Sequence, residues 1–485
     1  MDALKKTIKK LNEEEYAGLL VKMGIGKDSK PYQVMEMARN KNFDDTEMID
    51  HLQVNPSTYY TLKSRLRAKI ASVLSKEVDN PISVLMDEVA RVPANLYGPN
   101  KEVSTRALKD LEKQLLEYDL SNELIIVYKT LAQLNLYTYD YEYYTKLYNK
   151  YVAYSLAVSK AENLFYDFVK KIGQYQLTGS PQDLEAVSAL ERELSNICEL
   201  YGSHRLYVYY NIVRIYYLCI VPEMINELKK KEMEIDSTLI EIKKIFDKYQ
   251  LDTFYQNIKF VVDFLYFTYY LRTGSIVRAE HYYKKANEKV ADVSQKHILN
   301  FYVVQILNAK LELYNHTGNL NELTDLNETI ENDLDIDKNE TYHFLAVKKF
   351  LAACKFYEGD FQKAARQMND LRNEMNLKQY PLMDIECKLF QAMQYCMMGD
   401  DELFIQIINS IKRQISEDEP GHDQIKVFIK LLNAGMKPTE FKKKVEKINQ
   451  LWREFKEVQM VEYPILSFVK LDDKIIKKLA DPYKS

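Results

Sequence analysis

Histidine and cysteine are the side chains that most often bind metal ions or act as catalytic bases and nucleophiles. No two of the seven histidines stand three or four residues apart, so no helix carries a pair that would bind zinc together. The five cysteines form no C-x-x-C pair and occur in helix-like stretches, where a reduced cysteine behaves as a small hydrophobic residue. We therefore expect no catalytic residue, metal site or cofactor, and a protein that is not an enzyme.

A second chemistry, phosphate binding, is suggested by the basic residues between positions 63 and 69. The stretch 46–70 is similar to a helix-turn-helix, with a first helix that ends at Leu52, a turn, and a second helix that begins at Thr58. In that motif the second helix lies in the major groove of DNA, and basic side chains neutralise phosphates. The expected DNA contacts are Tyr60 and Thr61 near the bases and Lys63, Arg65, Arg67 and Lys69 on the phosphates.

The same stretch also fits a helical domain that only caps the rest of the chain or docks a partner. Gln53 stands where the helix-turn-helix usually has glycine, and many helical hairpins with a polar turn resemble the motif. Residues 1–76 hold 14 Lys and Arg against 10 Asp and Glu, in a chain whose net charge is −4. A local basic excess is compatible with DNA binding but does not require it.

The elements that must position these side chains are helices. Glycine and proline number 13 and 12 in 485 residues, well below the average usage of roughly 7% and 5%. This scarcity favours long helices joined by short turns. The N-terminus lacks the apolar core of a signal peptide, and the most apolar stretch, 258–271, is short and contains Asp263. We expect an all-α, cytoplasmic protein without a membrane segment.

Turn glycines recur at a nearly constant interval in the second half of the chain. Gly274, Gly318, Gly359 and Gly399 follow one another at intervals of 44, 41 and 40 residues, and Gly179 belongs to the same set. Glycine adopts the left-handed conformation that ends a helix, and an Asp, Asn or Ser after it can cap the next helix. Because one helical hairpin cannot bury its apolar face alone, the period predicts stacked hairpins.

The unit around Gly274 resembles a tetratricopeptide repeat. Tyr270 precedes the glycine, and Ala279, Tyr283 and Ala286 follow it at positions where that family uses the same types of residue. The resemblance implies a right-handed α-solenoid of about seven helical hairpins, although the period here exceeds the family's repeat of about 34 residues.

The inner helices of tetratricopeptide units line a concave groove, so the resemblance also implies binding positions. Arg272, Asn308 and Lys349 are suited to hold a carboxylate or an acidic peptide through charge-assisted hydrogen bonds. An ordinary solvated helix face is the alternative. The positions expected in the groove are Thr268, Arg272, Asn308, Glu312, Asn315, Lys349, Phe356 and Tyr357.

Two functional hypotheses follow. In the first, the chain is a non-enzymatic interaction scaffold that binds a protein or peptide in its groove. In the second, it is a transcriptional regulator whose N-terminal helix-turn-helix binds DNA while the solenoid senses a peptide or dimerises. In both, the chain divides into an N-terminal helical domain, a linker, a solenoid and C-terminal capping helices, at 1–76, 77–103, 104–435 and 436–485.

Overall fold

The computed structural model describes residues 8, 13–26, 29–40, 45–76, 81–98, 100–249, 252–293, 299–334, 336–415, 422–458 and 463–481. Within these residues every regular element is a helix and no strand is present, which confirms the all-α fold class. No helix in this part of the chain is long and apolar enough to cross a membrane.

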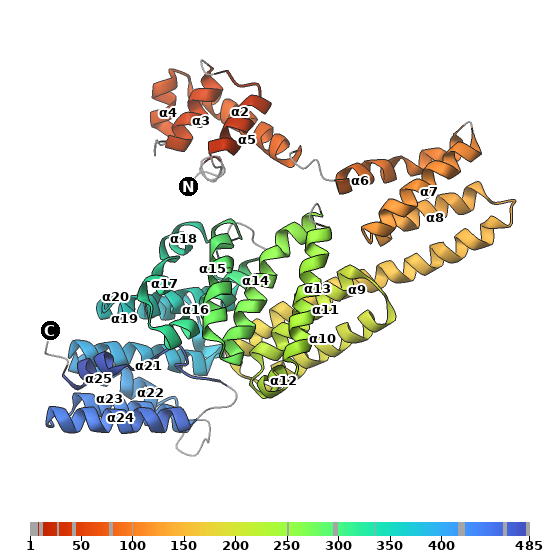
Figure 1. The fold of residues 1–485 in the computed structure, drawn as a ribbon. Helices are drawn as coiled ribbons and strands as arrows, with labels where there is room; N and C mark the ends of the chain where they lie inside the picture. The colour runs from red at the N-terminus through yellow and green to blue at the C-terminus, as the bar shows by residue number, and fades with distance from the viewer. Residues whose placement is uncertain are drawn as a thin grey trace. The chain divides into compact units, whose positions relative to one another are not determined.

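The chain forms two compact units, Met1–Leu111 and Glu112–Ser485. The first unit contains α2 (Glu13–Lys22), α3 (Lys30–Asn40), α4 (Asp45–Leu52), α5 (Pro56–Lys76), α6 (Pro81–Arg91), the 3-10 turn η1 (Val92–Tyr97) and the start of α7 (Lys101–Glu117). Figure 1 shows this unit in red and orange.

The first unit has a hydrophobic core of its own, to which α2 to α5 contribute. Tyr59, Leu66 and Ile70 of α5 are each 3% exposed or less, as their helical spacing predicts. Gln53, between α4 and α5, has a φ of 48°, so it takes the left-handed conformation expected at this turn. Asn55 caps α5 by accepting the backbone N–H of Thr58 at 2.7 Å.

The second unit is a succession of helices in which chain neighbours pack on one another, α8 on α9, α9 on α10, α14 on α15, α19 on α20, α20 on α21 and α23 on α24 (Figure 1). The helices are α8 (Ser121–Leu134), α9 (Asp140–Thr178), α10 (Pro181–Leu200), α11 (His204–Ile220), α12 (Ile225–Lys230), α13 (Glu232–Lys248), α14 (Thr253–Thr273), α15 (Ile276–Val293), α16 (Asn300–Thr317), α17 (Leu320–Thr324), α18 (Asn327–Asp333), α19 (Thr341–Tyr357), α20 (Phe361–Glu374), α21 (Pro381–Met398), α22 (Asp401–Lys412), α23 (Asp423–Met436), α24 (Phe441–Glu457) and α25 (Asp473–Ala480).

The recurring glycines end helices as predicted. All five have φ between 64° and 86°, in the left-handed region that side chains disfavour. The residue after the glycine caps the next helix at three of these turns, where the side chain accepts a backbone N–H: Asn319 from Glu322, Asp360 from Lys363, and Asp400 from Leu403. Ser180 makes no such bond.

Two buried polar side chains of α15 and α16, Tyr283 and Lys310, share a partner. Lys310 of α16 is 2% exposed, and its ammonium forms an ion pair with Asp325, between α17 and α18. The Tyr283 hydroxyl of α15 donates to the same carboxylate at 3.2 Å, and Asn287 donates to it at 3.0 Å. Such pairing offsets part of the cost of burying a charge.

Helix α9 contacts helices that lie far along the chain from it. It packs against α19 and α21. At Gly173, a Cβ atom would come within 3.0 Å of the Tyr342 ring, so the glycine permits this close approach. Three residues further on, Gln176 and Gln305 exchange amide hydrogen bonds of 2.9 and 3.3 Å. The C-terminal end of α9 therefore lies beside α16, which carries Gln305, and α19, which carries Tyr342.

Candidate functional site

Helices α9, α11, α14, α16, α19 and α21 of the second unit line a cavity of about 450 Å³. We call the cavity and the side chains of these helices around it the groove. Five positions expected from the sequence line it: Thr268, Arg272, Asn308, Glu312 and Lys349. The sequence argument missed other polar lining residues, chiefly Gln176, Tyr216, Gln305, Tyr342 and Glu386.

The predicted polar residues pair with neighbours on adjacent helices. Arg272 Nη1 of α14 lies 2.6 Å from Glu312 Oε1 of α16. Asn308 Nδ2 donates to the Tyr342 hydroxyl at 3.0 Å. Lys349 Nζ lies 3.1 Å from Glu386 Oε2. These bonds cross from one helix to the next, so they hold the groove's polar atoms in fixed positions.

A non-helical stretch, residues 463–472, lies against the groove, and we call it the C-terminal segment. Its anchor is Glu386, which is 1% exposed. The carboxylate accepts the backbone N–H of Leu466 at 2.6 Å and the Tyr463 hydroxyl at 3.0 Å. Hydrogen bonds to an ionised acceptor are stronger than those between neutral groups. The groove thus binds both the backbone and a side chain of the segment.

A second set of bonds holds the following residues of the segment. The Tyr357 hydroxyl donates to the Phe468 carbonyl and accepts the Lys470 N–H, both at 2.8 Å. Burial raises the pKa of Tyr357, so its hydroxyl stays protonated and able to do both. Asn315 Nδ2 donates to the Ser467 carbonyl at 3.2 Å. Two residues expected in the groove therefore bind the segment's backbone.

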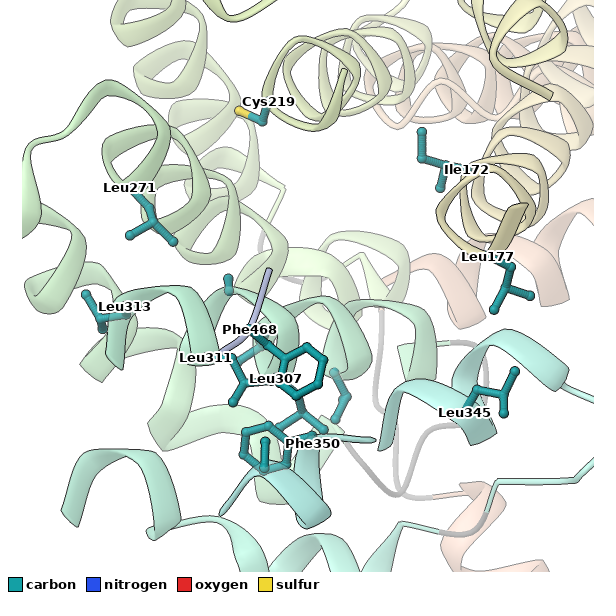
Figure 2. Packing of buried hydrophobic residues seen from close by; sticks show 14 of the residues in the cluster. Ile172, Leu177, Cys219, Leu271, Leu307, Leu311, Leu313, Leu345, Phe350 and Phe468 are labelled. Carbon is teal, nitrogen blue, oxygen red and sulfur yellow. The ribbon is translucent and has the colours of Figure 1, made fainter. Parts of the chain in front are cut away.

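The Phe468 ring is one of several apolar side chains that the segment buries, together with Ile465, Leu466, Val469 and Leu471. It is 5% exposed and belongs to the same hydrophobic cluster as Leu311 and Phe350. Figure 2 shows Phe468 among core residues contributed by α9, α11, α14, α16 and α19. Lys349 Nζ lies 5.1 Å from the ring centroid, within the range of a cation–π contact.

Leu466 of the segment has a strained backbone. Its φ is 53°, a conformation that costs a residue with a side chain roughly 1–2 kcal/mol. Leu466 is also 1% exposed, so both its burial and the bond to Glu386 oppose relaxation. Strain of this kind persists where the surroundings impose it and often marks functional segments.

Three of the residues expected in the groove, Asn315, Phe356 and Tyr357, do not line the cavity. Phe356 lies in the core. It is 2% exposed and packs against Phe361 and Phe390, with ring centroids 5.7 and 5.4 Å away, between α19, α20 and α21. Within the range 436–485, expected to cap the end of the chain, α24 packs on α23 and α25 packs on both, whereas the C-terminal segment lies against the groove.

In the first unit, some basic residues of α5 are bound to other residues of the unit and others are exposed to solvent. Lys63 forms an ion pair of 2.7 Å with Asp45, and Lys69 Nζ donates to the Met23 carbonyl at 2.7 Å. Tyr60 is 52% exposed. Thr61, Arg65 and Arg67 are also exposed. Two of the expected phosphate contacts are thus engaged inside the unit.

The groove is suited to binding by hydrogen bonds, ion pairs and apolar contacts. Its one cysteine, Cys219, is buried, which raises the pKa of its thiol to about 12 and keeps it protonated. No cluster of metal-binding side chains is present in the described part of the chain.

Comparison with known proteins gives no relative. No protein-family model, curated protein or solved structure matches the chain.

Proposed function

We propose that the second unit is a divergent α-solenoid of the tetratricopeptide kind, and that its groove binds an extended segment of a partner protein. The supporting observation is the C-terminal segment. Glu386, Tyr357 and Asn315 bind its backbone, and the groove buries its Phe468 ring. Backbone recognition by fixed side chains, with an aromatic anchor, is how many peptide-binding domains work.

The segment suggests the chemistry of the partner. It presents two aromatic residues, Tyr463 and Phe468, five positions apart, and the groove satisfies the hydroxyl of one and buries the ring of the other. A partner segment with the same spacing would make the same contacts. The partner segment must displace the C-terminal segment of the chain itself, whose effective concentration at the groove is on the order of millimolar.

Five cysteines without a disulfide support a reducing, cytoplasmic location.

A labelled peptide with the sequence of residues 463–472 tests this proposal. In a variant of the full chain, these residues are replaced by Gly and Ser over the same length, so that α25 remains attached. We expect the peptide to bind this variant at micromolar concentration, and the wild type at least tenfold more weakly, because the wild-type groove is occupied. Fluorescence anisotropy measures both affinities.

Matched changes identify the site of binding. Tyr357→Phe in the same variant, or Phe468→Ala in the peptide, should weaken binding about tenfold, through loss of hydrogen bonds to the peptide backbone or of the buried ring. If the variant keeps its helical circular dichroism but binds no peptide, the proposed function is wrong.

A second candidate function, DNA binding by the first unit, is favoured by the exposed Tyr60, Arg65 and Arg67 on α5. We expect the full chain to bind duplex DNA weakly at physiological salt, because Lys63 and Lys69 are engaged within the unit. A gel-shift assay measures this. Tight binding lost in Arg65→Ala/Arg67→Ala, but kept in the control Lys363→Ala/Arg366→Ala, would establish DNA binding instead.

A further inference from the structure

The turn between α8 and α9 (Figure 1) presents large apolar side chains to solvent. Tyr137 and Tyr139 are 97% and 102% exposed, and Leu136 beside them is 51% exposed. The exposed apolar surface continues along α9 with Tyr143 and Leu156. Single exposed apolar residues are ordinary on a protein surface, whereas a group of them on one element marks an interaction site.

The exposed part of α9 also carries charged side chains that have no ion-pair partner among the described residues: Asp140, Glu142, Lys146 and Lys150. The two acids come first along the helix and the two lysines follow. A second copy of the helix that runs antiparallel places its lysines beside the acids of the first copy, and its acids beside the lysines. The order of charges therefore makes this surface complementary to itself.

Spacing along α9 sets the register of such a pair. Tyr139 precedes α9 but has a helical backbone. It is followed at intervals of four, three and four residues by Tyr143, Lys146 and Lys150, so the four form one stripe on the helix. A two-fold axis midway between Tyr143 and Lys146 places each lysine of one copy opposite a tyrosine of the other. Each ammonium then lies over an aromatic ring and beside the acid next to that ring in sequence.

The charge balance of the α8–α9 hairpin favours a second copy over a nucleic acid or an acidic membrane. Between positions 121 and 156 there are three acids, three lysines and no arginine. Binding to phosphates or to acidic lipids requires an excess of basic side chains. A two-fold interface between identical surfaces requires instead that the charges on each surface balance, as they do here.

We propose that two copies of the chain form a dimer through antiparallel pairing of the first half of α9 about a two-fold axis. Lys146 of each copy pairs with Glu142 of the other, and Lys150 pairs with Asp140. The α8–α9 turn of each copy covers the exposed Leu156 of the other. The paired residues do not line the groove, so dimerisation goes beyond peptide binding and is tested separately from it.

Analytical ultracentrifugation of the full chain, of 57.2 kDa, tests the inference. We expect a dimer at micromolar concentration, and a monomer with unchanged helical circular dichroism in Tyr139→Ser/Tyr143→Ser. The control Met233→Ser/Val277→Ser removes exposed apolar side chains of α13 and α15 and should remain a dimer. A wild-type chain that stays monomeric up to about 0.1 mM would overturn the inference. So would a monomer that binds phosphatidylcholine vesicles through Tyr139 and Tyr143, which would assign the turn to a membrane surface.

Reversal of single charges distinguishes contacts between copies from effects within one helix. Glu142→Lys and Lys146→Glu each set like charges against each other across the axis, so each should raise the dissociation constant of the dimer at least about tenfold. An equimolar mixture of the two variants should recover dimers, because each copy then supplies the charge that its partner lacks. A mixture that stays monomeric, or single variants that dimerise as the wild type does, would contradict the proposed pairing of α9.

Discussion

Two regions of the second unit differ in whether their buried polar groups have hydrogen-bond or ion-pair partners. Between α15 and α16, Lys310 and Tyr283 both find a partner in Asp325. At the groove, the Tyr216 and Thr268 hydroxyls find none, and Leu466 has a strained backbone. In the first region the chain itself supplies the partner of each of these two buried groups, whereas at the groove no described residue pairs with the two hydroxyls.

Among substitutions that test this comparison, we expect the largest loss of stability where α15 packs on α16. Asp325→Ala leaves the buried Lys310 ammonium without its ion-pair partner and should lower the free energy of unfolding by about 3 kcal/mol. Urea unfolding followed by the fluorescence of Trp452, the single tryptophan, reports on the second unit alone.

The control for that change removes the other partner. Lys310→Met should alter stability by less than about 1 kcal/mol, since Asp325 is 35% exposed and keeps its bonds to Tyr283 and Asn287. Equal losses in the two variants would mean that the pairing of charges does not determine the stability of this interface.

A smaller and more local effect is expected at the groove. Glu386→Gln keeps the size of the side chain but removes the charge that holds Leu466 and Tyr463. The C-terminal segment should be loosened by about 2 kcal/mol, the value of hydrogen bonds to a charged group. Hydrogen exchange should show faster exchange in residues 466–470 and little change in α23. Acceleration across the whole unit would show instead that Glu386 supports the fold as such.

The smallest effect is expected at a turn, where the sequence alone predicts the conformation. Gly318→Ala should lower the free energy of unfolding by about 1 kcal/mol, because φ is 70° and no atom obstructs a Cβ there. Gly202→Ala is the control, with open space around it and no left-handed φ, and should change stability little. Thermal unfolding of both variants measures the difference.

Local features were predictable from the sequence because they depend on neighbouring residues. The left-handed glycines and the caps at Asp360 and Asp400 follow from residue type and position. Thr268, Arg272 and Lys349 were predicted from the resemblance to tetratricopeptide repeats, which implies groove-facing positions at fixed distances before each turn glycine. Phe356, next to Tyr357 on α19, was assigned to the groove but lies in the core, since adjacent residues point to different sides of a helix.

The rest of the site depends on contacts between distant parts of the chain. Gln176 meets Gln305 across 129 residues, and Tyr357 meets Phe468 across 111. Helical periodicity holds no information on such pairs. In sequence the C-terminal segment is a short apolar stretch after a proline, and nothing in it indicates Glu386 as its anchor.

Native-state hydrogen exchange of the wild-type chain tests the central claim, that the C-terminal segment is a displaceable occupant of the groove. An occupant opens locally, whereas a part of the core exchanges only when the unit unfolds. We predict that the Leu466 and Lys470 amides exchange at least about tenfold faster than the Leu311 amide in α16, as expected for local opening. Equal protection of the segment and α16, in both the wild type and Glu386→Gln, would contradict the claim.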